Sequence, residues 1–279
     1  MANDAVLVTG ASTGIGHAIA MHLAANGYTV YAGVRKEDDR ERLEAEHTRI
    51  RPVILDVTVP ADVTRAVQTV RENGDTLSGL VNNAGVAIAG PLEFLPLEAL
   101  RYQFEINVIA PIAMTQAALP LLRETQGRIV NVGSIAGRLS APFVGPYSAS
   151  KAAIASLTDA LRQELARFGI AVSLLEFASV KTPIWQKGRA GRDALVSSMP
   201  PQAMTYYGAL ADAVIAQTRV EEREGMDPAI IAATVLAALR APKPRERYVI
   251  GRKAQIQAVA AMLPPSARDA LVKRAMKLP

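Results

Sequence analysis

With 279 residues, half of them apolar, the chain can bury a sizeable core, and we expect one domain over residues 1–279. Its 31 Lys and Arg exceed its 26 Asp and Glu by five, an excess that we expect to be spread along the chain and that argues against nucleic-acid binding. The lack of cysteine excludes disulfides, thiolate metal sites and cysteine nucleophiles, and no other motif predicts a metal site.

Short runs rich in Val, Ile and Leu alternate with longer helical patterns through most of the chain. Such runs are typical of strands covered on both faces, and the segments between them are long enough for crossover helices. The pattern predicts an α/β fold, a Rossmann-like, doubly wound parallel sheet with helices on both faces. The predicted strands are 5–10, 29–34, 51–57, 78–85, 127–134, 171–177 and, after a less regular stretch from about Trp185 to Gly225, 247–251.

The N-terminal segment MANDAVLVTG enters a strand at once, without a charged and then apolar leader. The longest apolar run, AIIAATVLAAL from Ala229, is too short to span a bilayer. We therefore expect a soluble, cytoplasmic protein with no transmembrane segment.

The first strand passes into a helix through TGASTGIG, residues 9–16. Gly10 allows a sharp turn, Gly14 lets the backbone approach a pyrophosphate, and Gly16 lets the helix pack on the strand. Glycines at such a turn are also common for steric reasons alone. The position directly after the first strand of an alternating α/β pattern favours a dinucleotide site over that alternative.

The second strand ends in AGVRKEDD. A site that prefers NAD has an acidic residue at this strand end, whereas one that prefers NADP has a cation for the 2′-phosphate. Here Val34 occupies the acidic position and Arg35 follows it. The planar guanidinium of Arg35 suits a phosphate, so the segment predicts NADP(H), while we interpret Lys36 as a solvated side chain.

The segments NNAG (residues 82–85) and YSASK (residues 147–151), with Asn107 and Ser134, form a third group. Tyr147 and Lys151 are four residues apart and so share one helix face, and Ser134 leaves the carboxyl end of a strand, where open parallel sheets bind ligands. Singly, each could be structural. Together and in this order, they make the chain similar to the short-chain dehydrogenase/reductase family over residues 4–183.

That resemblance implies roles for individual residues. Tyr147 would be the general acid/base, Lys151 would lower its pKa and hold the nicotinamide ribose, Ser134 would orient the substrate oxygen, and Asn107 would hold a water in the proton relay. A free tyrosine titrates near ~10, and a neighbouring ammonium independently favours the phenolate. The implied cofactor-binding residues are Gly10, Ser12, Thr13, Gly14, Ile15, Gly16, Arg35, Asp56, Val57, Asn83, Ala84, Gly85, Lys151 and Thr182.

One segment departs from the family pattern. The last central strand normally runs into Pro-Gly, whose backbone lies against the nicotinamide, and then to a Thr that meets the carboxamide. This chain has Thr182 but places Phe177 and Ala178 where Pro-Gly would be. The explanations are a natural variant with a reshaped pocket, an engineered site, or a degraded cofactor site. The intact tyrosine, lysine, serine, asparagine and loop glycines favour a reshaped pocket with Phe177 beside the nicotinamide.

The segment 185–226 occupies the position of the family's variable substrate lid and contains Trp185, Met199, Met204, Tyr206 and Tyr207. Such residues suit a bulky apolar ketone, or they pack the lid on the domain. VYAGVRK and the basic C-terminal end resemble the steroid and retinoid branch of the family. The prediction is an NADP(H)-dependent oxidoreductase for a hydrophobic carbonyl/alcohol pair, and the alternative is an NADP-binding regulatory or scaffold protein. The apolar helices 96–123 and 147–168 resemble those that pair across a two-fold axis in the family, which predicts a homodimer or homotetramer.

Overall fold

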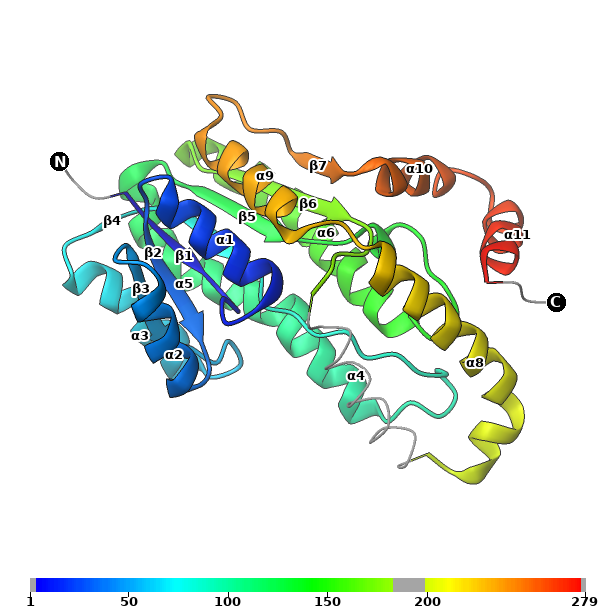
Figure 1. Ribbon diagram of the computed structural model, residues 1–279. Coiled ribbons are helices and arrows are strands. Elements are labelled where there is room, and N and C mark those ends of the chain that lie inside the picture. Colours follow the sequence, from blue (N-terminus) through cyan, green and yellow to red (C-terminus); the bar gives the residue numbers. More distant parts are fainter. Residues whose placement is uncertain (1–3, 183–198, 277–279) are drawn as a thin grey trace.

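Seven parallel strands form one sheet in the order β3-β2-β1-β4-β5-β6-β7 (Figure 1). The computed structural model describes residues 4–182 and 199–276. All the predicted strands are present within a few residues of their expected ends. Their bounds are β1 Asp4–Val8, β2 Thr29–Val34, β3 Ile50–Ile54, β4 Thr76–Asn82, β5 Arg128–Val132, β6 Ala171–Phe177 and β7 Arg247–Ile250.

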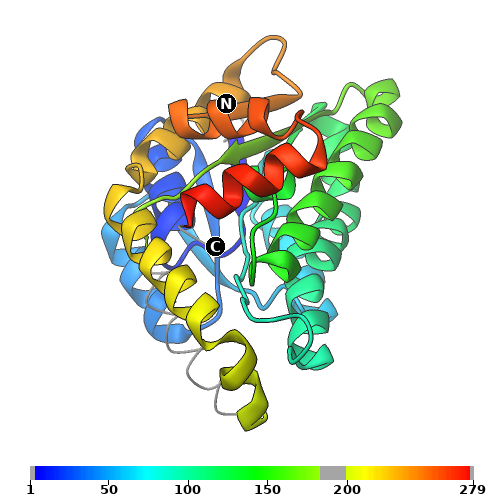
Figure 2. The same ribbon diagram turned by 90° about the vertical axis from the view of Figure 1, so that its right-hand side faces the viewer.

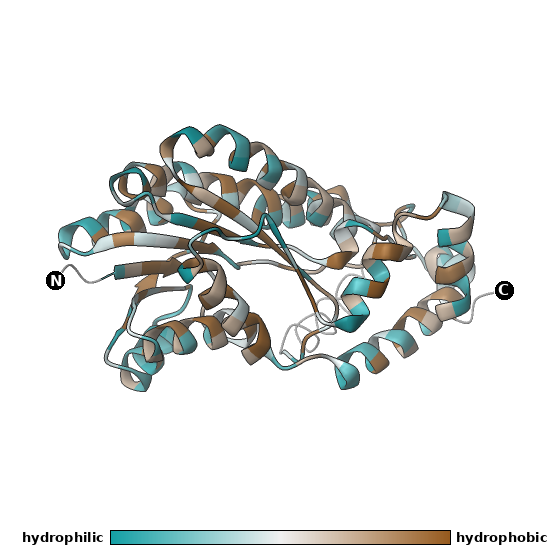
Figure 3. Ribbon diagram, turned by 90° about the horizontal axis from the view of Figure 1, so that it is seen from above, coloured by the Kyte–Doolittle hydropathy of each residue, from teal (hydrophilic) through white to brown (hydrophobic). Residues whose placement is uncertain are grey.

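Helices cover both faces of this sheet, as Figure 3 shows with the sheet between two helical layers. The first layer contains α1 (Gly14–Ala25), α2 (Glu37–Glu46) and α9 (Pro228–Arg240), and the second contains α3 (Pro60–Glu72), α5 (Ala110–Thr125) and α6 (Gly145–Leu165). The other α-helices of the described residues are α4 (Leu97–Phe104), α8 (Pro201–Glu224), α10 (Arg252–Ala260) and α11 (Pro265–Ala275). The predicted doubly wound fold is confirmed.

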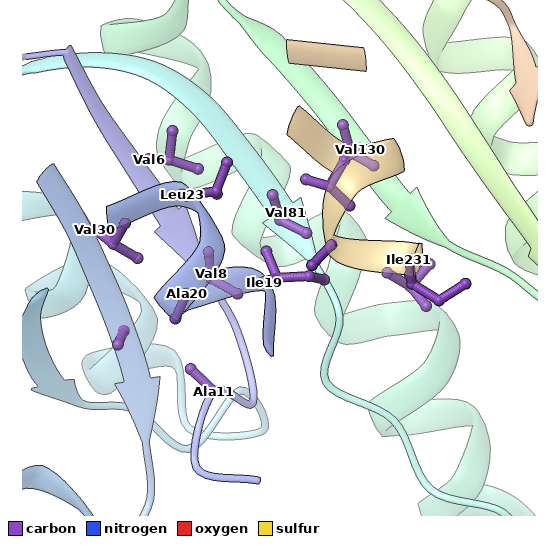
Figure 4. Close-up of a cluster of buried hydrophobic side chains, with 14 of the residues drawn as sticks. Val6, Val8, Ala11, Ile19, Ala20, Leu23, Val30, Val81, Val130 and Ile231 are labelled. Atoms are coloured by element: carbon purple, nitrogen blue, oxygen red, sulfur yellow. The ribbon is translucent and has the colours of Figure 1, made fainter. Parts of the chain in front are cut away.

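Alternate residues of the strands supply two separate hydrophobic cores. Val6, Val8 and Val30 face the first layer and pack with Ile19 of α1 and Ile231 of α9 (Figure 4). Their neighbours face the second layer, where buried residues of β1, β2 and β4 meet Met114 and Leu122 of α5. Because both faces are buried, the central strands β1 and β2 are apolar over most of their length, and this is the pattern that the sequence showed.

The strands β1 and β4 are hydrogen bonded to each other, and the strand order reverses between them. From β1 the sheet continues to β2 and β3, and from β4 it continues in the other direction to β5, β6 and β7. In open α/β sheets this switch point opens a crevice at the carboxyl ends of the strands, where ligands bind. The strand arrows of β6 and β7 in Figure 1 point toward that edge, and Figure 2 looks onto it. The glycine loop and the NNAG segment both leave the sheet at this point.

Two helical segments differ from the sequence expectation. The stretch predicted to be irregular contains the 24-residue helix α8, which begins with Pro201 at its first position, where proline is well tolerated. The predicted helix 96–123 is continuous from α4 to α5 but contains a π-helical turn, Glu105–Ile109. Residues 183–198 of the predicted lid, including Trp185, lie outside the described residues.

That continuous run, Leu97–Thr125, is long and apolar enough to cross a membrane by length and composition, and within the described residues it is the one helix that meets both criteria. The apolar run from Ala229, which the sequence analysis weighed, is the shorter helix α9. In the structure, 56% of the tested window of Leu97–Thr125 is buried. Its second half packs on β4 and α3 as part of the second core.

Candidate active site

The glycine loop has the conformation that a phosphate-binding turn requires. Gly10 and Gly14 have φ values of 66° and 61°, a region that L side chains rarely adopt. A Cβ on Gly16 would lie 2.2 Å from the Gly10 carbonyl oxygen, so only glycine allows α1 to begin this close to the strand end. The first turn of α1 contains no acidic residue. Its N-terminus therefore keeps the partial positive charge that favours an anion.

The loop is tied to the NNAG segment by hydrogen bonds. The Thr9 hydroxyl oxygen accepts from the backbone N–H groups of Asn83 and Ala84, each at 3.0 Å. The Asn83 side-chain amide donates to the carbonyl oxygens of Thr9 (2.9 Å) and Gly10 (3.1 Å). Asn83 and Ala84 therefore lie beside the loop, and these hydrogen bonds hold the NNAG segment to it. Thr9 was missed because a threonine before a glycine loop has no distinctive sequence signal.

A second unpredicted group holds the other side of the loop. The Arg42 guanidinium donates to the Ser12 carbonyl oxygen at 2.6 Å and pairs with Asp39 and Glu46. Glu46 also contacts His17 of α1 at 2.5 Å, so α2 is fixed to the loop and to α1. Burial raises the pKa of Glu46, but the hydrogen bonds from His17 and Arg42 outweigh this effect and leave its pKa below the ordinary value.

At the end of β2, Val34 is buried in the first core and Arg35 is exposed. Val34 pairs with Ile54 of β3, which brings Arg35 close to Asp56 at the end of the neighbouring strand. Burial raises the pKa of Asp56, but two Thr58 hydrogen bonds (2.9 and 2.7 Å) and the charge of Arg35 lower it below its ordinary value. A cation and a carboxylate thus lie side by side where the sequence places the adenosine end of the cofactor, and Val57 packs on the second core.

Tyr147, Ser134 and Lys151 meet at the carboxyl edge of β5. Ser134 caps a short 3₁₀ turn, Ile135–Gly137, and is hydrogen bonded to the Tyr147 side chain. The Lys151 ammonium donates to the Val132 carbonyl oxygen at 2.9 Å and lies 5.8 Å from the centre of the Tyr147 ring. A Cβ on Gly137 would lie 2.8 Å from the Lys151 backbone, so this glycine lets the serine turn pack directly on α6.

Burial dominates the electrostatics of this group. It raises the pKa of Tyr147 above its ordinary value, and the Ser134 hydrogen bond only partly offsets this. That Lys151 lowers the pKa of Tyr147 stays a prediction, because the raised value comes from the burial of the tyrosine itself and not from the lysine. Burial lowers the pKa of Lys151 to about 8. The tyrosine is therefore a protonated phenol near neutral pH.

Asn107 lies in the π-helical turn and binds two segments next to Tyr147. Its side-chain oxygen accepts from the Val86 N–H and its amide donates to the Val86 carbonyl oxygen, both at 2.9 Å, and also to Ser150 at 3.0 Å. The Ser150 hydroxyl in turn donates to the Tyr147 carbonyl oxygen at 2.7 Å. Gly85 lies close to both Asn107 and Lys151, since a Cβ there would lie 3.3 Å from the Asn107 side-chain oxygen and 3.8 Å from the Lys151 side-chain nitrogen. Single π turns often mark functional sites, but no sequence pattern announces them.

Comparison with known proteins agrees with this geometry. The profile of the short chain dehydrogenases matches residues 4–193. The chain belongs to the short-chain dehydrogenase family. An NADPH-dependent 3-dehydrocapnine reductase from Ornithobacterium rhinotracheale is 34% identical over 97% of this chain and 96% of the relative. Retinol dehydrogenase 5 from Mus musculus is 34% identical over 97% of this chain and 88% of the relative. A short chain dehydrogenase from Burkholderia cenocepacia, solved in complex with NADP, superposes with a TM-score of 0.75 at 28% identity, covering 97% of this chain and 98% of that one.

The resemblance to the steroid and retinoid branch of the short-chain dehydrogenases is thereby confirmed, and the protein is an oxidoreductase of this family. In contrast, the position of Phe177 corrects the sequence interpretation of the hinge. Its side chain is 6% exposed and belongs to the first core with Val180 and Ile250. It therefore packs inside the domain.

The hinge of this dehydrogenase is held by Met226 and by α8. Val180 and Met226 form a parallel bridge, in which Met226 donates to the Ser179 carbonyl oxygen at 3.0 Å and accepts from the Lys181 N–H at 2.9 Å. The Ser179 hydroxyl donates to Glu221 of α8 at 2.6 Å. Thr182, which is partly buried, follows this clamp and ends the described segment.

Aromatic residues gather beside the N-terminus of α6, where Tyr147 lies. The ring centres of Phe94 and Tyr206 are 6.4 Å apart, and Tyr207 lies 6.0 Å from both Phe94 and Phe143. The Tyr207 hydroxyl donates to Glu93 at 2.7 Å. Phe143 has a φ of 66°, a strained value for a non-glycine residue of the kind found at functional sites. The N-terminal half of α8 is thus docked on both loops that flank the tyrosine.

A buried carboxylate holds the loop that follows Ser134. Glu176 of β6 is 1% exposed, accepts from Arg138 with both oxygens, and is 3.4 Å from Arg247 of β7. Arg138 directly follows the 3₁₀ turn that begins after Ser134. The sequence analysis did not identify Glu176, because an acidic residue inside an apolar strand can only be interpreted once its arginine partners are known.

Proposed function

We propose that the protein is an NADP(H)-dependent oxidoreductase that interconverts a bulky hydrophobic ketone, or aldehyde, and its alcohol. The observation that supports the reaction is the contact of Ser134, Tyr147 and Lys151 at the carboxyl edge of the sheet, next to the glycine loop. Support for NADP(H) comes from the exposed Arg35 at the end of β2 and from the relatives whose names include NADPH or NADP.

The residues present fit this cofactor. The turn at Gly10, Gly14 and Gly16 would hold its pyrophosphate against the N-terminus of α1, with Ser12, Thr13 and Ile15 forming the rest of the loop. Arg35 would hold the 2′-phosphate, Asp56 and Val57 the adenine, and Asn83, Ala84 and Gly85 the adenosine ribose side. Lys151 would hold the nicotinamide ribose and Thr182 the carboxamide. When bound, the cofactor supplies the hydride.

The chain's own residues would then supply protons and geometry. Tyr147, protonated near neutral pH, donates its phenolic proton to the carbonyl oxygen as negative charge develops there. Ser134 donates a hydrogen bond to the same oxygen and so fixes the carbonyl group. Lys151 stabilises the phenolate that remains after the transfer, because an ammonium nearby favours the charged form. Asn107 holds the Val86 segment and, through Ser150, the Tyr147 backbone.

The aromatic cluster supports a hydrophobic substrate. Phe94, Phe143, Tyr206 and Tyr207 lie on the loops and the lid helix next to α6, and Met204 of α8 is also exposed. Apolar walls with a few directed polar groups are typical of sites for small hydrophobic molecules. These contacts also pack the lid, so the substrate class needs a direct test.

The test is a ketone and alcohol panel with NADPH or NADP⁺, followed by the absorbance of the reduced cofactor. We expect turnover of bulky apolar ketones, and abolition of that turnover by Tyr147→Phe with NADPH binding nearly unchanged. Retained activity in Tyr147→Phe would refute the role of the tyrosine. NADPH binding without turnover of any ketone or alcohol would favour the alternative of a regulatory or scaffold protein.

We also propose a homodimer or homotetramer through α5 and α6. Both helices contribute to an apolar groove lined by Ile112, Leu119, Leu157, Leu161 and Phe168. Leu157 and Phe168 are 37% and 38% exposed and face the same groove, so they form part of a contiguous apolar surface. Light scattering at micromolar concentration tests the proposal, and a monomeric mass would contradict it.

A further inference from the structure

We propose that the C-terminal helices α10 and α11 form a surface that binds an anionic lipid membrane. The first observation is the distribution of charge. Residues 251–279 contain six of the 31 Lys and Arg but one of the 26 Asp and Glu, which leaves 25 of each in residues 1–250. The expectation that the positive excess is spread along the chain is therefore wrong. The whole net charge of +5 belongs to this C-terminal segment, as in proteins with a basic segment for an anionic partner.

The second observation is the face that α10 turns to solvent. Ile256, Val259 and Leu263 are 59%, 68% and 42% exposed, and their spacing of three and four places them on one side of a helix. Helical hydrogen bonds continue from Ala260 to Leu263, so the stripe does not end with α10. Ala254, two residues before Ile256 and so on the opposite side, is fully buried. The large apolar side chains of this helix therefore face solvent, while the small Ala254 faces the domain.

Further exposed apolar residues continue this surface. Met262 is 85% exposed between the two helices, and Leu271 of α11 is 43% exposed. Arg252, Lys273 and Arg274 are exposed around them, while Lys253 is paired with Glu221 of the lid at 2.5 Å. In Figures 1 and 3, α10 and α11 lie at the outer end of the molecule, and in Figure 2 α11 crosses in front of the strand ends.

This combination fits a membrane surface better than another class of partner. Large apolar side chains surrounded by lysine and arginine are the signature of interfacial helices, whose apolar side enters the acyl boundary while the cations meet anionic headgroups. A nucleic acid would use the cations but would leave Ile256, Val259 and Met262 without an apolar partner. A second copy of this chain presents the same positive charge, so the two surfaces would repel each other.

The test is co-sedimentation of the whole protein with vesicles of phosphatidylcholine alone, or with about one third phosphatidylglycerol. We expect binding to the anionic vesicles and a weaker affinity at high salt. Ile256→Glu with Val259→Glu should lower that affinity at least about 30-fold, since two charges replace two inserted apolar side chains. Lys273→Gln with Arg274→Gln should lower it by about 25-fold, or roughly fivefold for each cation, and should not affect binding to neutral vesicles.

The matched control is Ile230→Glu with Ala233→Glu. It adds the same two charges at the same spacing on the exposed side of α9, where Ile230 is 50% exposed. Thermal unfolding and NADPH binding of every variant show whether the fold is kept. The proposal is overturned if the wild-type protein ignores anionic vesicles, or if the α9 control loses as much affinity as the α10 variant. A wild-type oligomer that the α10 variant converts to a lower mass, without vesicle binding, would instead make this surface an interface between copies.

Discussion

Replacing Phe177 with alanine tests whether the hinge residue is part of the core or part of the cofactor pocket. The side chain is 6% exposed and packs in the first hydrophobic core with Val180 and Ile250. Ala178, next to it, is not among the residues with positive φ in the described part of the chain, so its backbone does not need glycine. We therefore expect Phe177→Ala to reduce stability and leave the choice of ketone unchanged.

The magnitude follows from the lost packing. Truncating a buried phenylalanine to alanine costs about 3–5 kcal/mol of unfolding free energy. The removed atoms no longer gain free energy by leaving water on folding, and a cavity remains in their place. Unfolding entropy of about 2 cal/mol/K per residue gives about 0.6 kcal/mol/K for a chain of this length. The melting temperature should therefore fall by about 5–8 °C.

Calorimetry or circular dichroism of the melting transition measures this shift, and initial rates over the ketone panel measure selectivity. Phe168→Ala is the matched control, because that side chain is 38% exposed and its ring lies 4.9 Å from the Arg123 guanidinium and 5.2 Å from that of Arg167. Its truncation should cost about 1 kcal/mol, or ~2 °C. A Phe177→Ala protein with an unchanged melting temperature and altered ketone selectivity would show that the ring borders the nicotinamide after all.

Three further predictions concern charged residues. Arg35→Ala should weaken NADPH binding by about tenfold or more and NADH binding much less, since only NADPH brings a 2′-phosphate to that cation. Equal losses of affinity for both cofactors in a fluorescence titration would show that Arg35 does not bind the 2′-phosphate. Burial lowers the pKa of Lys151 to about 8, so above that pH the unfolded chain binds a proton that the folded chain has lost. The free energy of unfolding of wild type relative to Lys151→Met should therefore rise by up to about 3 kcal/mol between pH 8 and 10.5, and a flat difference in denaturant titrations would contradict it. Glu176→Gln should cost about 3–5 kcal/mol by breaking a buried pair with Arg138, whereas Glu98→Gln, in an exposed pair with Arg101, should cost less than ~1 kcal/mol; similar losses in urea unfolding would mean that Glu176 is not structurally important.

The sheet could be predicted from sequence because each of its determinants is local. A strand covered on both faces is mostly apolar, so a run such as residues 29–34 is visible as a mainly apolar block, and all six of its residues are buried. The glycine loop was visible for the same reason, since positive φ at Gly10 and Gly14 depends on the residue type itself. Tyr147 and Lys151 were visible through their helical spacing.

The supporting residues could not be predicted, because their partners are distant in the chain. Thr9 meets Asn83 across 74 positions, and Ser179 meets Glu221 across 42. A hydroxyl or a carboxylate of this kind has the same sequence context as any solvated residue until the fold brings its partner to it. The effect of burial on the pKa of Tyr147 could not be predicted for a related reason, since burial depends on surrounding elements that the YSASK motif does not describe.

The hinge at residues 177–179 is restricted by distant contacts where the family's Pro-Gly hinge is restricted by its own residue types, and this difference bears on whether the cofactor site is degraded. In a Pro-Gly hinge the backbone is restricted by the residue types themselves. Here the corresponding segment is restricted from outside: Met226 bridges Val180, and Glu221 accepts from Ser179. A Cβ on Gly225 would lie 2.8 Å from the Lys181 nitrogen, so the end of the lid helix fits closely against the hinge. Glu221 also binds Lys253 of α10 at 2.5 Å, which links the hinge to the C-terminal helices. Loss of function would relax such contacts, whereas their presence supports a hinge whose geometry is set by α8, Met226 and α10.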